Sequence, residues 1–386
     1  MKKITVLGCG MVGRAIAVDL AKFYNVTSVD INKRNLDLLP FTANIETEEA
    51  DLSNSQHITS VIANADLVIG AVPGFMGFEM LRTVISNRKN IVDISFFPED
   101  PFLLDELARE QNVTAVVDCG VAPGMDNIIL GYHNERMEVS QFICLVGGLP
   151  FRRTMPFQYK APFSPIDVLE EYTRPARLVE NGKVVVKPAL SEIEEVEFEE
   201  IGTLESFNSD GLRSLVKTME ITNMKEKTLR YPGHAKLMEI LRDMGFFSKG
   251  EIQAGEIRVS PLKVAAALLF PKWKYENHEK DFTVMRVVIE GIENGISKVY
   301  RYDLFDEYDI ASQTSSMART TGYTCTGAAT MLLEGIYVKK GIIPPEYLGK
   351  DEKCYHFLLS YLKERGIIYR KHENFAAESR DSWIYS

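Results

Sequence analysis

Short apolar runs alternate with segments of helical periodicity through the first third of the chain. The runs have the length and composition of buried strands. They cover residues 4–7, 26–29, 67–72, 91–94 and 113–117. Between the first two runs, Ala15, Ile16 and Leu20 recur at helical spacing. This alternation predicts an α/β domain with a doubly wound parallel sheet, in which ligands bind beyond the carboxyl ends of the strands.

The pattern changes from about Gln141, where strand-like runs are no longer separated by single helices. Asn181-Gly182 stands between two β-rich runs within residues 178–186, which is a strong hairpin signal because both turn residues need positive φ. Further strands are predicted at 142–146, 282–289 and 299–304, and helices at 237–244, 262–269 and 324–337. The chain is therefore expected to form a mixed α+β second domain, and its last helix is suited to packing back on a sheet.

A glycine-rich motif, Gly8-Cys9-Gly10-Met11-Val12-Gly13, joins the first predicted strand to the first helix. In a dinucleotide-binding turn the first glycine permits the tight turn, the second lets the backbone approach a pyrophosphate, and the third lets helix and strand pack closely. The helix N-terminus then faces the phosphates. We therefore expect Gly8, Gly10, Met11, Val12 and Gly13 to bind a dinucleotide; the alternative is a glycine-rich turn that binds nothing.

The carboxyl ends of the other predicted strands supply further candidates for cofactor binding. Asp30 ends the second strand, where a carboxylate binds the adenosine ribose hydroxyls and repels a 2′-phosphate, which favours NAD over NADP. Lys33 and Arg34 follow closely and soften that preference. The remaining candidates lie just after later strands and are Ala71, Val72, Pro73 and Ser95.

Length and charge narrow the class of protein. A chain of 386 residues is expected to form two or three domains. Its net charge of -10, with no basic block, argues against nucleic acid or an anionic membrane surface as partner. No apolar run approaches the roughly 20 residues of a membrane span. A small-molecule partner is the remaining expectation.

Cysteine usage and the first residues predict a cytoplasmic protein. The five cysteines are scattered without a C-x-x-C pair, so neither a disulfide framework nor a metal site is expected. Met1-Lys2-Lys3 leads almost directly into the first strand, which leaves no room for a cleavable signal peptide.

Polar residues after the last parallel strand are the first candidates for chemistry. Asp118 follows that strand, where the nicotinamide would lie. Asp126 stands a few residues later at the predicted start of a helix. It either caps that helix or contributes to the floor of a substrate pocket.

A second group of candidates lies in the second domain. Arg213 and Arg230 point to recognition of a carboxylate, because a guanidinium matches a carboxylate bidentately. The alternative is a pair of surface salt bridges. His234 begins an amphipathic helix and is either a candidate base or a residue bonded to the preceding turn. Lys160 is a candidate base if it is buried, because desolvation lowers the pKa of an amine; otherwise it is solvated.

Several motifs resemble the saccharopine dehydrogenase family, and within it the lysine 6-dehydrogenase branch. Besides the glycine motif, they are Gly120-Val121-Ala122-Pro123-Gly124-Met125-Asp126-Asn127-Ile128, Val146-Gly147-Gly148-Leu149-Pro150, Glu171-Tyr172-Thr173-Arg174-Pro175-Ala176, Thr228-Leu229-Arg230-Tyr231-Pro232-Gly233-His234 and Met317-Ala318-Arg319-Thr320-Thr321-Gly322-Tyr323. The resemblance implies a Rossmann domain (1–125), an inserted mixed α+β substrate and dimerisation domain (126–315), a C-terminal return onto the Rossmann domain (316–386), and a homodimer.

The resemblance also implies a reaction. NAD would oxidise the ε-amine of L-lysine to 2-aminoadipate 6-semialdehyde, which cyclises to piperideine-6-carboxylate, and ammonia would be released. Asp118 or His234 would act as the base, while Arg213 and Arg230 would hold the α-carboxylate of lysine. The stretch from Asp210 to Arg213 departs from the glycine-rich version of some lysine 6-dehydrogenases, and so leaves the assignment of Arg213 open.

Two other functions stay open. Saccharopine reductases are similar too, and related enzymes act on carboxynorspermidine; both classes work on an imine condensed from an amine and a carbonyl compound. The turn of saccharopine reductases typically reads Gly-Leu-Asp-Pro-Gly, whereas Ala122 replaces the aspartate here, which favours a simpler amine. The third possibility is an NAD-binding protein without turnover.

Overall fold

The computed structural model describes residues 1–40, 44–276, 278–375 and 384. Two compact units make up the chain. Unit 1 comprises Met1–Glu135 and Met317–Ile368, and unit 2 comprises Arg136–Ser316 and Tyr369–Ser386. Among the described residues, no helix combines the length and the apolar character needed to span a membrane.

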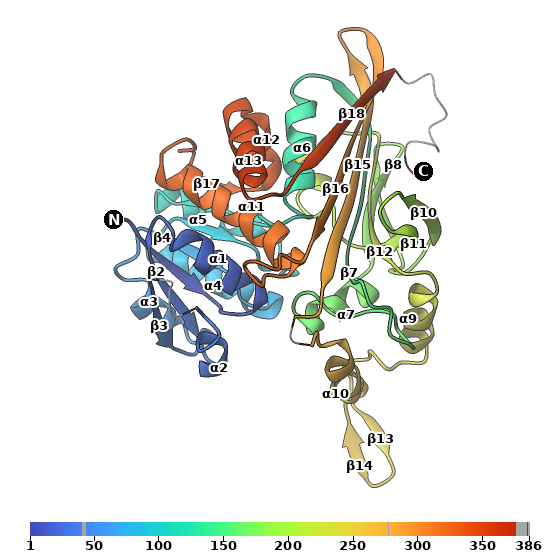
Figure 1. Ribbon diagram of the computed structural model, residues 1–386, viewed down its shortest axis with the longest axis horizontal. Coiled ribbons are helices and arrows are strands. Elements are labelled where there is room, and N and C mark those ends of the chain that lie inside the picture. The colour runs from blue at the N-terminus through green and yellow to red at the C-terminus, as the bar shows by residue number, and fades with distance from the viewer. Residues whose placement is uncertain (41–43, 277, 376–383, 385–386) are drawn as a thin grey trace. The chain divides into compact units, whose positions relative to one another are not determined.

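Unit 1 is built on a seven-stranded parallel sheet (Figure 1). Its strands are β1 (Lys3–Leu7), β2 (Asn25–Asp30), β3 (Ile45–Glu49), β4 (Leu67–Gly70), β5 (Ile91–Asp93), β6 (Thr114–Val116) and β17 (Gly341–Ile343). They lie in the order β3-β2-β1-β4-β5-β6-β17, so the chain changes direction across the sheet between β1 and β4. Open sheets of this kind bind ligands at such a switch point. The predicted doubly wound fold is confirmed.

The sequence pattern predicts the strands of unit 1 whose side chains are buried. Every residue of β4 and β5 is buried, as expected of strands with helices on both faces. The edge strand β3 is different: its sequence is Ile-Glu-Thr-Glu-Glu and four of its five residues are exposed. Because no apolar run marks β3, the sequence pattern does not predict it.

Helices connect and cover the strands of unit 1. They are α1 (Met11–Leu20), α2 (Lys33–Leu36), α3 (Ser55–Val61), α4 (Gly74–Ser86), α5 (Asp105–Glu110), α6 (Met125–Asn134), α11 (Ser316–Leu333), α12 (Pro345–Lys350), α13 (Glu352–Glu364) and the short 3₁₀ helix η1 (Pro101–Leu104). The C-terminal helices are fastened to α1 by the buried carboxylate of Asp19. It accepts hydrogen bonds from Thr326 Oγ1 at 2.8 Å and from Tyr361 Oη at 3.0 Å, and Arg365 Nε lies 2.9 Å away.

The last part of the chain differs from the expected return over residues 316–386. Residues 317–368 belong to unit 1, but the chain then enters unit 2 as β18 (Tyr369–Phe375). There β18 pairs antiparallel with β16 (Ile296–Glu307). The expected boundary is therefore wrong beyond Ile368. Most of β18 is polar, so hydrophobic patterning gives no sign of the strand.

Unit 2 contains a mixed sheet of nine strands. Its other members are β7 (Glu138–Pro150), β8 (Ala176–Glu180), β9 (Lys183–Lys187), β10 (Glu194–Phe198), β11 (Gly202–Asn208), β12 (Asn223–Arg230) and β15 (Asp281–Glu293). The predicted hairpin joins β8 to β9, with φ of 51° at Asn181 and 74° at Gly182. The helices of this unit are α7 (Pro165–Thr173), α8 (Leu215–Thr218), α9 (His234–Asp243) and α10 (Pro261–Trp273).

A separate two-stranded hairpin, formed by β13 (Ile252–Ala254) and β14 (Ile257–Val259), extends beyond α10 within unit 2 (Figure 1). The core of unit 2 lies elsewhere. One apolar cluster is formed by the central strands and includes Leu145, Leu229 and Val284. A second cluster lies around Trp273 and includes Tyr159 and Tyr172.

Candidate functional site

The glycine turn between β1 and α1 is packed against the end of β4. Gly8 has a φ of 105°, and a Cβ there would come within 2.3 Å of the carbonyl oxygen of Ala71. A Cβ on Gly13 would come within 2.1 Å of the carbonyl oxygen of Gly8. A side chain at Gly8 would therefore push the turn away from the end of β4, and one at Gly13 would push α1 away from Gly8. The first and third glycines have the packing roles that the sequence predicts.

Gly10 has a different environment, because no heavy atom lies within 4 Å of the position that a Cβ would occupy. It precedes α1, whose first intrahelical hydrogen bond joins Arg14 N to Gly10 O at 3.0 Å. The amides of Met11 and Val12 come before that bond. Open space at a helix N-terminus suits a pyrophosphate, which accepts hydrogen bonds from such amides. The turn therefore fits a dinucleotide.

Asp30 ends β2 beside this turn. Its Oδ2 accepts a hydrogen bond from Cys9 N at 2.8 Å, and its Oδ1 accepts one from Asn32 N at 2.8 Å. The Asn35 amide also donates to Oδ1, at 3.3 Å. The carboxylate is thus fixed between the glycine turn and the loop after β2. Cys9 is fully buried, and burial raises the pKa of its thiol, so Cys9 is a packing residue here.

The other predicted cofactor residues lie at the carboxyl ends of β4 and β5. Ala71 contacts the glycine turn, and its N–H donates to Leu7 O at 2.8 Å. Val72 is buried, and Pro73 directly precedes α4. Ser95 follows β5 and donates from Oγ to Asp93 Oδ1 at 2.8 Å. The structure brings Ala71 to the turn, while Ser95 is engaged with its own strand.

Asp118 lies just beyond β6 in left-handed backbone conformation, with a φ of 50°. Only 3% of the residue is exposed. The neighbouring Cys119 is fully buried and its amide donates to Asp93 O at 3.0 Å. Burial raises the pKa of the Cys119 thiol well above its usual value, so the thiol is protonated and unreactive. The role of Asp118 in the reaction stays a prediction.

Asp126 serves the start of α6. Its Oδ1 accepts a hydrogen bond from Gly124 N at 2.9 Å, and Gly124 has a φ of 147° that disfavours other residues. The next residue, Asn127, donates to Glu346 Oε2 at 3.0 Å. Asp126 thus lies in the first turn of α6 and binds the amide of the N-cap residue Gly124, and its part in substrate binding stays a prediction.

Arg230 lies in a buried cluster in unit 2, where only 3% of its side chain is exposed. Its Nη2 lies 2.6 Å from Glu171 Oε2. Its Nε donates to Tyr172 Oη at 3.2 Å, and its Nη1 donates to Leu229 O at 2.9 Å. The guanidinium also lies 4.4 Å from the centre of the Tyr159 ring. Most of its donors are engaged within unit 2, and its part in substrate binding stays a prediction.

His234 belongs to the same cluster. Its Nδ1 lies 2.8 Å from Phe157 O, and its Nε2 lies 2.9 Å from Tyr172 Oη. Because a carbonyl only accepts, Nδ1 carries the proton and Nε2 accepts from the tyrosine. Burial, together with the charge of Arg230, lowers the pKa of His234 to about 3. A neutral imidazole with both nitrogens engaged is poorly suited to act as a base at neutral pH.

Arg213 belongs to a second cluster of arginines in unit 2. It is buried, with a φ of 50°. Burial and the nearby charge of Arg213 lower the pKa of Arg174, whose Nη2 lies 3.7 Å from Glu170 Oε2. Arg177 donates from Nε and Nη2 to the two carboxylate oxygens of Asp210, at 2.8 Å each. Asp210 thus occupies the guanidinium of Arg177, and the part of Arg213 in substrate binding stays a prediction.

Lys160 is buried and forms an ion pair with Glu279. Its Nζ also lies 6.0 Å from the centre of the Tyr275 ring. The prediction of burial is correct, but the amine is engaged in an ion pair with a carboxylate. This contact does not favour the role of a base.

Sequence reasoning did not single out the partners of Arg230. Tyr159 and Trp273 meet edge to face with ring centres 5.5 Å apart, and Glu171 and Tyr172 contact Arg230 directly. Glu171 precedes Arg230 by 59 positions. No periodic pattern connects them, and only the motif around Glu171 marked this part of the chain.

Comparisons with known proteins match both parts of the chain. The family model described as the saccharopine dehydrogenase NADP binding domain matches residues 4–116. The model described as the saccharopine dehydrogenase C-terminal domain matches residues 120–367.

Individual relatives are distant. The mitochondrial alpha-aminoadipic semialdehyde synthase of Mus musculus is 23% identical over 95% of this chain and 47% of its own length, so the chain spans about half of that protein. Apo saccharopine dehydrogenase (L-Glu forming) from Saccharomyces cerevisiae is 19% identical, with a TM-score of 0.77 over 97% of this chain and 100% of that one. Homospermidine synthase from Legionella pneumophila, solved in complex with NAD, is 10% identical, with a TM-score of 0.62 over 98% and 92%. These structures share the fold.

The buried His234 predicts a loss of stability in mild acid. Its ordinary pKa is about 6.5, so between that pH and pH 3 the unfolded chain binds a proton that the folded chain does not. Stability present above pH 6.5 is lost as the pH falls. We expect this group to lower the free energy of unfolding by about 1.4 kcal/mol per pH unit below about pH 6. Urea denaturation at several pH values measures the slope.

In His234→Gln the free energy of unfolding should fall less steeply with falling pH. The difference in slope should be the contribution of one proton, about 1.4 kcal/mol per pH unit. His57→Gln, at an exposed position, should leave the slope unchanged. An identical pH dependence in His234→Gln and the unsubstituted protein would contradict the assignment of a neutral, buried His234.

Proposed function

Because the chain belongs to the saccharopine dehydrogenase family, we propose that it is a nicotinamide-dependent oxidoreductase acting on the carbon–nitrogen bond of an amino acid. The observation that carries the proposal is the open space at Gly10, beside the close packing of Gly8 and Gly13. Met11 and Val12 would offer their amides to the pyrophosphate, and Asp30 would bind the adenosine ribose. When bound, the cofactor supplies a hydride acceptor at its nicotinamide ring.

We propose NAD as the cofactor. The matching family model is described as NADP binding, and the homospermidine synthase was solved with NAD. The position of Asp30 supports NAD, because its carboxylate is held at the end of β2 by three hydrogen bonds and would repel a 2′-phosphate. Lys33 and Arg34 are exposed beyond β2 and would weaken this preference without reversing it.

The proposed substrate is L-lysine, oxidised at its ε-amine. A base takes a proton from the ammonium group, a hydride leaves Cε, water adds to the resulting iminium carbon, and ammonia leaves. Asp118 is proposed as the base, since the alternative, His234, is neutral and hydrogen-bonded at both nitrogens. The products are 2-aminoadipate 6-semialdehyde and ammonia, and the semialdehyde cyclises.

The arginine cluster of unit 2 is proposed to bind the α-carboxylate of lysine. Arg174 and Arg213 lie close enough for their charges to interact, as expected of a site built for an anionic group. Arg230 contributes indirectly, because its bond to Tyr172 and its ion pair with Glu171 fix the neighbouring α7. A fixed carboxylate sets the distance from the binding site to Cε, and positioning of this kind lowers a reaction barrier by several kcal/mol.

Saccharopine is the second candidate substrate. The name of the yeast structure supports it, as does the similarity over nearly the whole of both chains. Ala122 supports the simpler amine, because it replaces the aspartate that is typical of the saccharopine-type turn. The two reactions differ in product: oxidation of lysine releases ammonia, whereas oxidation of saccharopine in that class releases glutamate.

Turnover of lysine tests the function. The purified chain with L-lysine and NAD should give NADH, seen by its absorbance, and ammonia in equal amounts. Asp118→Asn should lower kcat at least about 100-fold, because it removes the proton acceptor, while NADH binding stays unchanged. Asp37→Asn, at an exposed position, is the matched control and should leave kcat as it is.

Other outcomes separate the alternatives. NADH formed with saccharopine and not with lysine, together with glutamate, would establish the second candidate. NAD binding without turnover of either substrate would contradict an enzymatic function on them.

The negative charge of Asp30 predicts a preference for NADH over NADPH. Asp30→Asn keeps the size of the side chain but removes its charge, so repulsion of a 2′-phosphate is lost. We expect the ratio of the Kd values for NADPH and NADH to fall by about tenfold, which corresponds to about 1.4 kcal/mol. Fluorescence titration with both reduced cofactors measures the ratio. Asp37→Asn should keep the original ratio, and an unchanged ratio in Asp30→Asn would remove Asp30 from the ribose site.

A further inference from the structure

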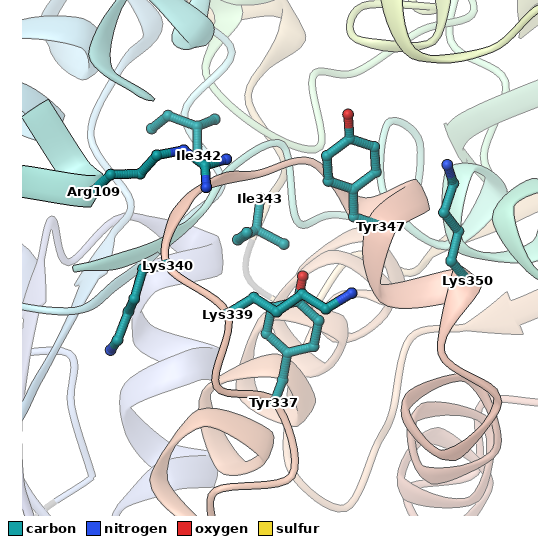
Figure 2. A pocket seen from close by; sticks show the side chains of 8 residues that line it. All are labelled: Arg109, Tyr337, Lys339, Lys340, Ile342, Ile343, Tyr347 and Lys350. Atoms are coloured by element: carbon teal, nitrogen blue, oxygen red, sulfur yellow. The ribbon is translucent and has the colours of Figure 1, made fainter. Parts of the chain in front are cut away.

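A cavity of about 510 Å³ lies in unit 1 beside the edge strand β17 (Figure 2). Eight residues line it, and four of them are cationic. The cationic and aromatic ones are Arg109, Tyr337, Lys339, Lys340, Tyr347 and Lys350. None of the eight is acidic, although the whole chain carries a net charge of -10. Cationic residues therefore gather around this cavity on an acidic protein.

The cations of the cavity differ in their partners. Arg109 donates from Nε to Asp105 at 2.7 Å, so one donor of its guanidinium group is already engaged. Lys350 Nζ lies 3.9 Å from Glu135 at a solvent-exposed pair, which holds it weakly. Among the residues that the structure describes, Lys339 and Lys340 form no ion pair. In Figure 2 the side chain of Lys339 extends among the lining residues, whereas that of Lys340 points away from them. Lys339 therefore carries charge that an anion in the cavity would neutralise.

Tyr337 supplies an independent sign of a ligand. The residue is only 4% exposed, and within the described part of the chain its hydroxyl has no hydrogen-bond partner. In Figure 2 the hydroxyl end points toward the middle of the lining residues. Burial raises the pKa of Tyr337, so the hydroxyl keeps its proton and remains a donor. A buried donor left unsatisfied is costly, and an anionic oxygen in the cavity would satisfy it.

The cavity is distinct from the glycine turn. Three strands, β6, β5 and β4, separate β17 from β1 in the sheet. Lys339 and Lys340 directly precede β17, and the side chain of Thr114, at the start of β6, donates to Lys339 O at 2.8 Å. The proposed pyrophosphate site lies instead beyond the carboxyl end of β1. A ligand of this cavity would therefore be a second ligand of unit 1.

We propose that unit 1 binds a small phosphate-bearing metabolite in this cavity. Lysines act as point charges that suit phosphate. Planar recognition of a carboxylate relies instead on an arginine whose guanidinium N–H groups are free. Arg109 already uses one of these groups to bind Asp105. The volume is that of a small-molecule site. The rings of Tyr337 and Tyr347, with Ile342 and Ile343, form the apolar part of the lining. This site goes beyond the proposed oxidoreductase activity and does not depend on it.

Isothermal titration calorimetry of the full chain with pyrophosphate, at low ionic strength, tests the proposal. We expect measurable binding that Tyr337→Phe weakens about tenfold, because a hydrogen bond to a charged group is lost. Lys339→Gln should weaken binding to a similar extent. Lys363→Gln removes the same charge from another exposed position of unit 1 and should leave the affinity unchanged.

Two further measurements test the alternatives. The melting temperature of Tyr337→Phe shows whether Tyr337 has only a packing role, and malonate binding shows whether the cavity binds any anion. Tyr337→Phe should melt at the same temperature as the unsubstituted protein or higher, because the hydroxyl has no partner to lose in the described chain. Malonate should bind at least about tenfold more weakly than pyrophosphate. The proposal is overturned by absence of pyrophosphate binding, by equal affinity in all variants, which would place the anion elsewhere, or by malonate binding as tightly as pyrophosphate.

Discussion

The close approach of Gly8 to Ala71 and Gly13 is the constraint on which the cofactor site depends. A Cβ at Gly8 or Gly13 would lie little more than 2 Å from a backbone oxygen. Glycine at both positions therefore lets β1, β4 and α1 pack together at the switch point of the sheet. Their packing leaves Gly10 facing open space at the start of α1. In the same turn the amide of Cys9 donates a hydrogen bond to the carboxylate of Asp30. This bond connects the glycine turn to the residue that is proposed to favour NAD over NADP.

Unit 2 uses buried charge in two different ways. Arg230 and Glu171 form an ion pair surrounded by Tyr159, Tyr172 and His234, and burial together with the positive charge keeps the imidazole neutral. Breaking such a pair leaves an uncompensated buried charge, so its members are held in fixed geometry. Arg174 and Arg213 are proposed to bind the carboxylate of an amino acid, while Arg177 is paired with Asp210. Positioning and binding are thus assigned to different arginines, whereas the sequence alone suggested one role for both Arg213 and Arg230.

Local patterns in the sequence predicted much of the fold and little of the site's detail. The parallel strands of unit 1 are buried on both faces and appear as apolar runs, and the Asn181-Gly182 turn demands positive φ, so both were predictable. The strands β3 and β18 are polar and gave no pattern. The partners of Arg230 come from distant parts of the chain, and the lysines beside β17 gather only when that strand joins β6. The homodimer and the cytoplasmic location stay predictions.

NADH binding to Gly10→Val tests the account most directly. Gly10 has a φ of -68° and no neighbour within 4 Å of a Cβ, so a protein with valine there should still fold while the side chain fills the space proposed for the pyrophosphate. Because Gly10 is the N-cap residue of α1, we expect a modest fall in the melting temperature. Gly250→Val, at an exposed glycine that also has no neighbour within 4 Å, is the matched control. The account predicts at least about 100-fold weaker NADH binding, by fluorescence titration, in Gly10→Val alone. Unchanged NADH affinity in a folded Gly10→Val protein would contradict it.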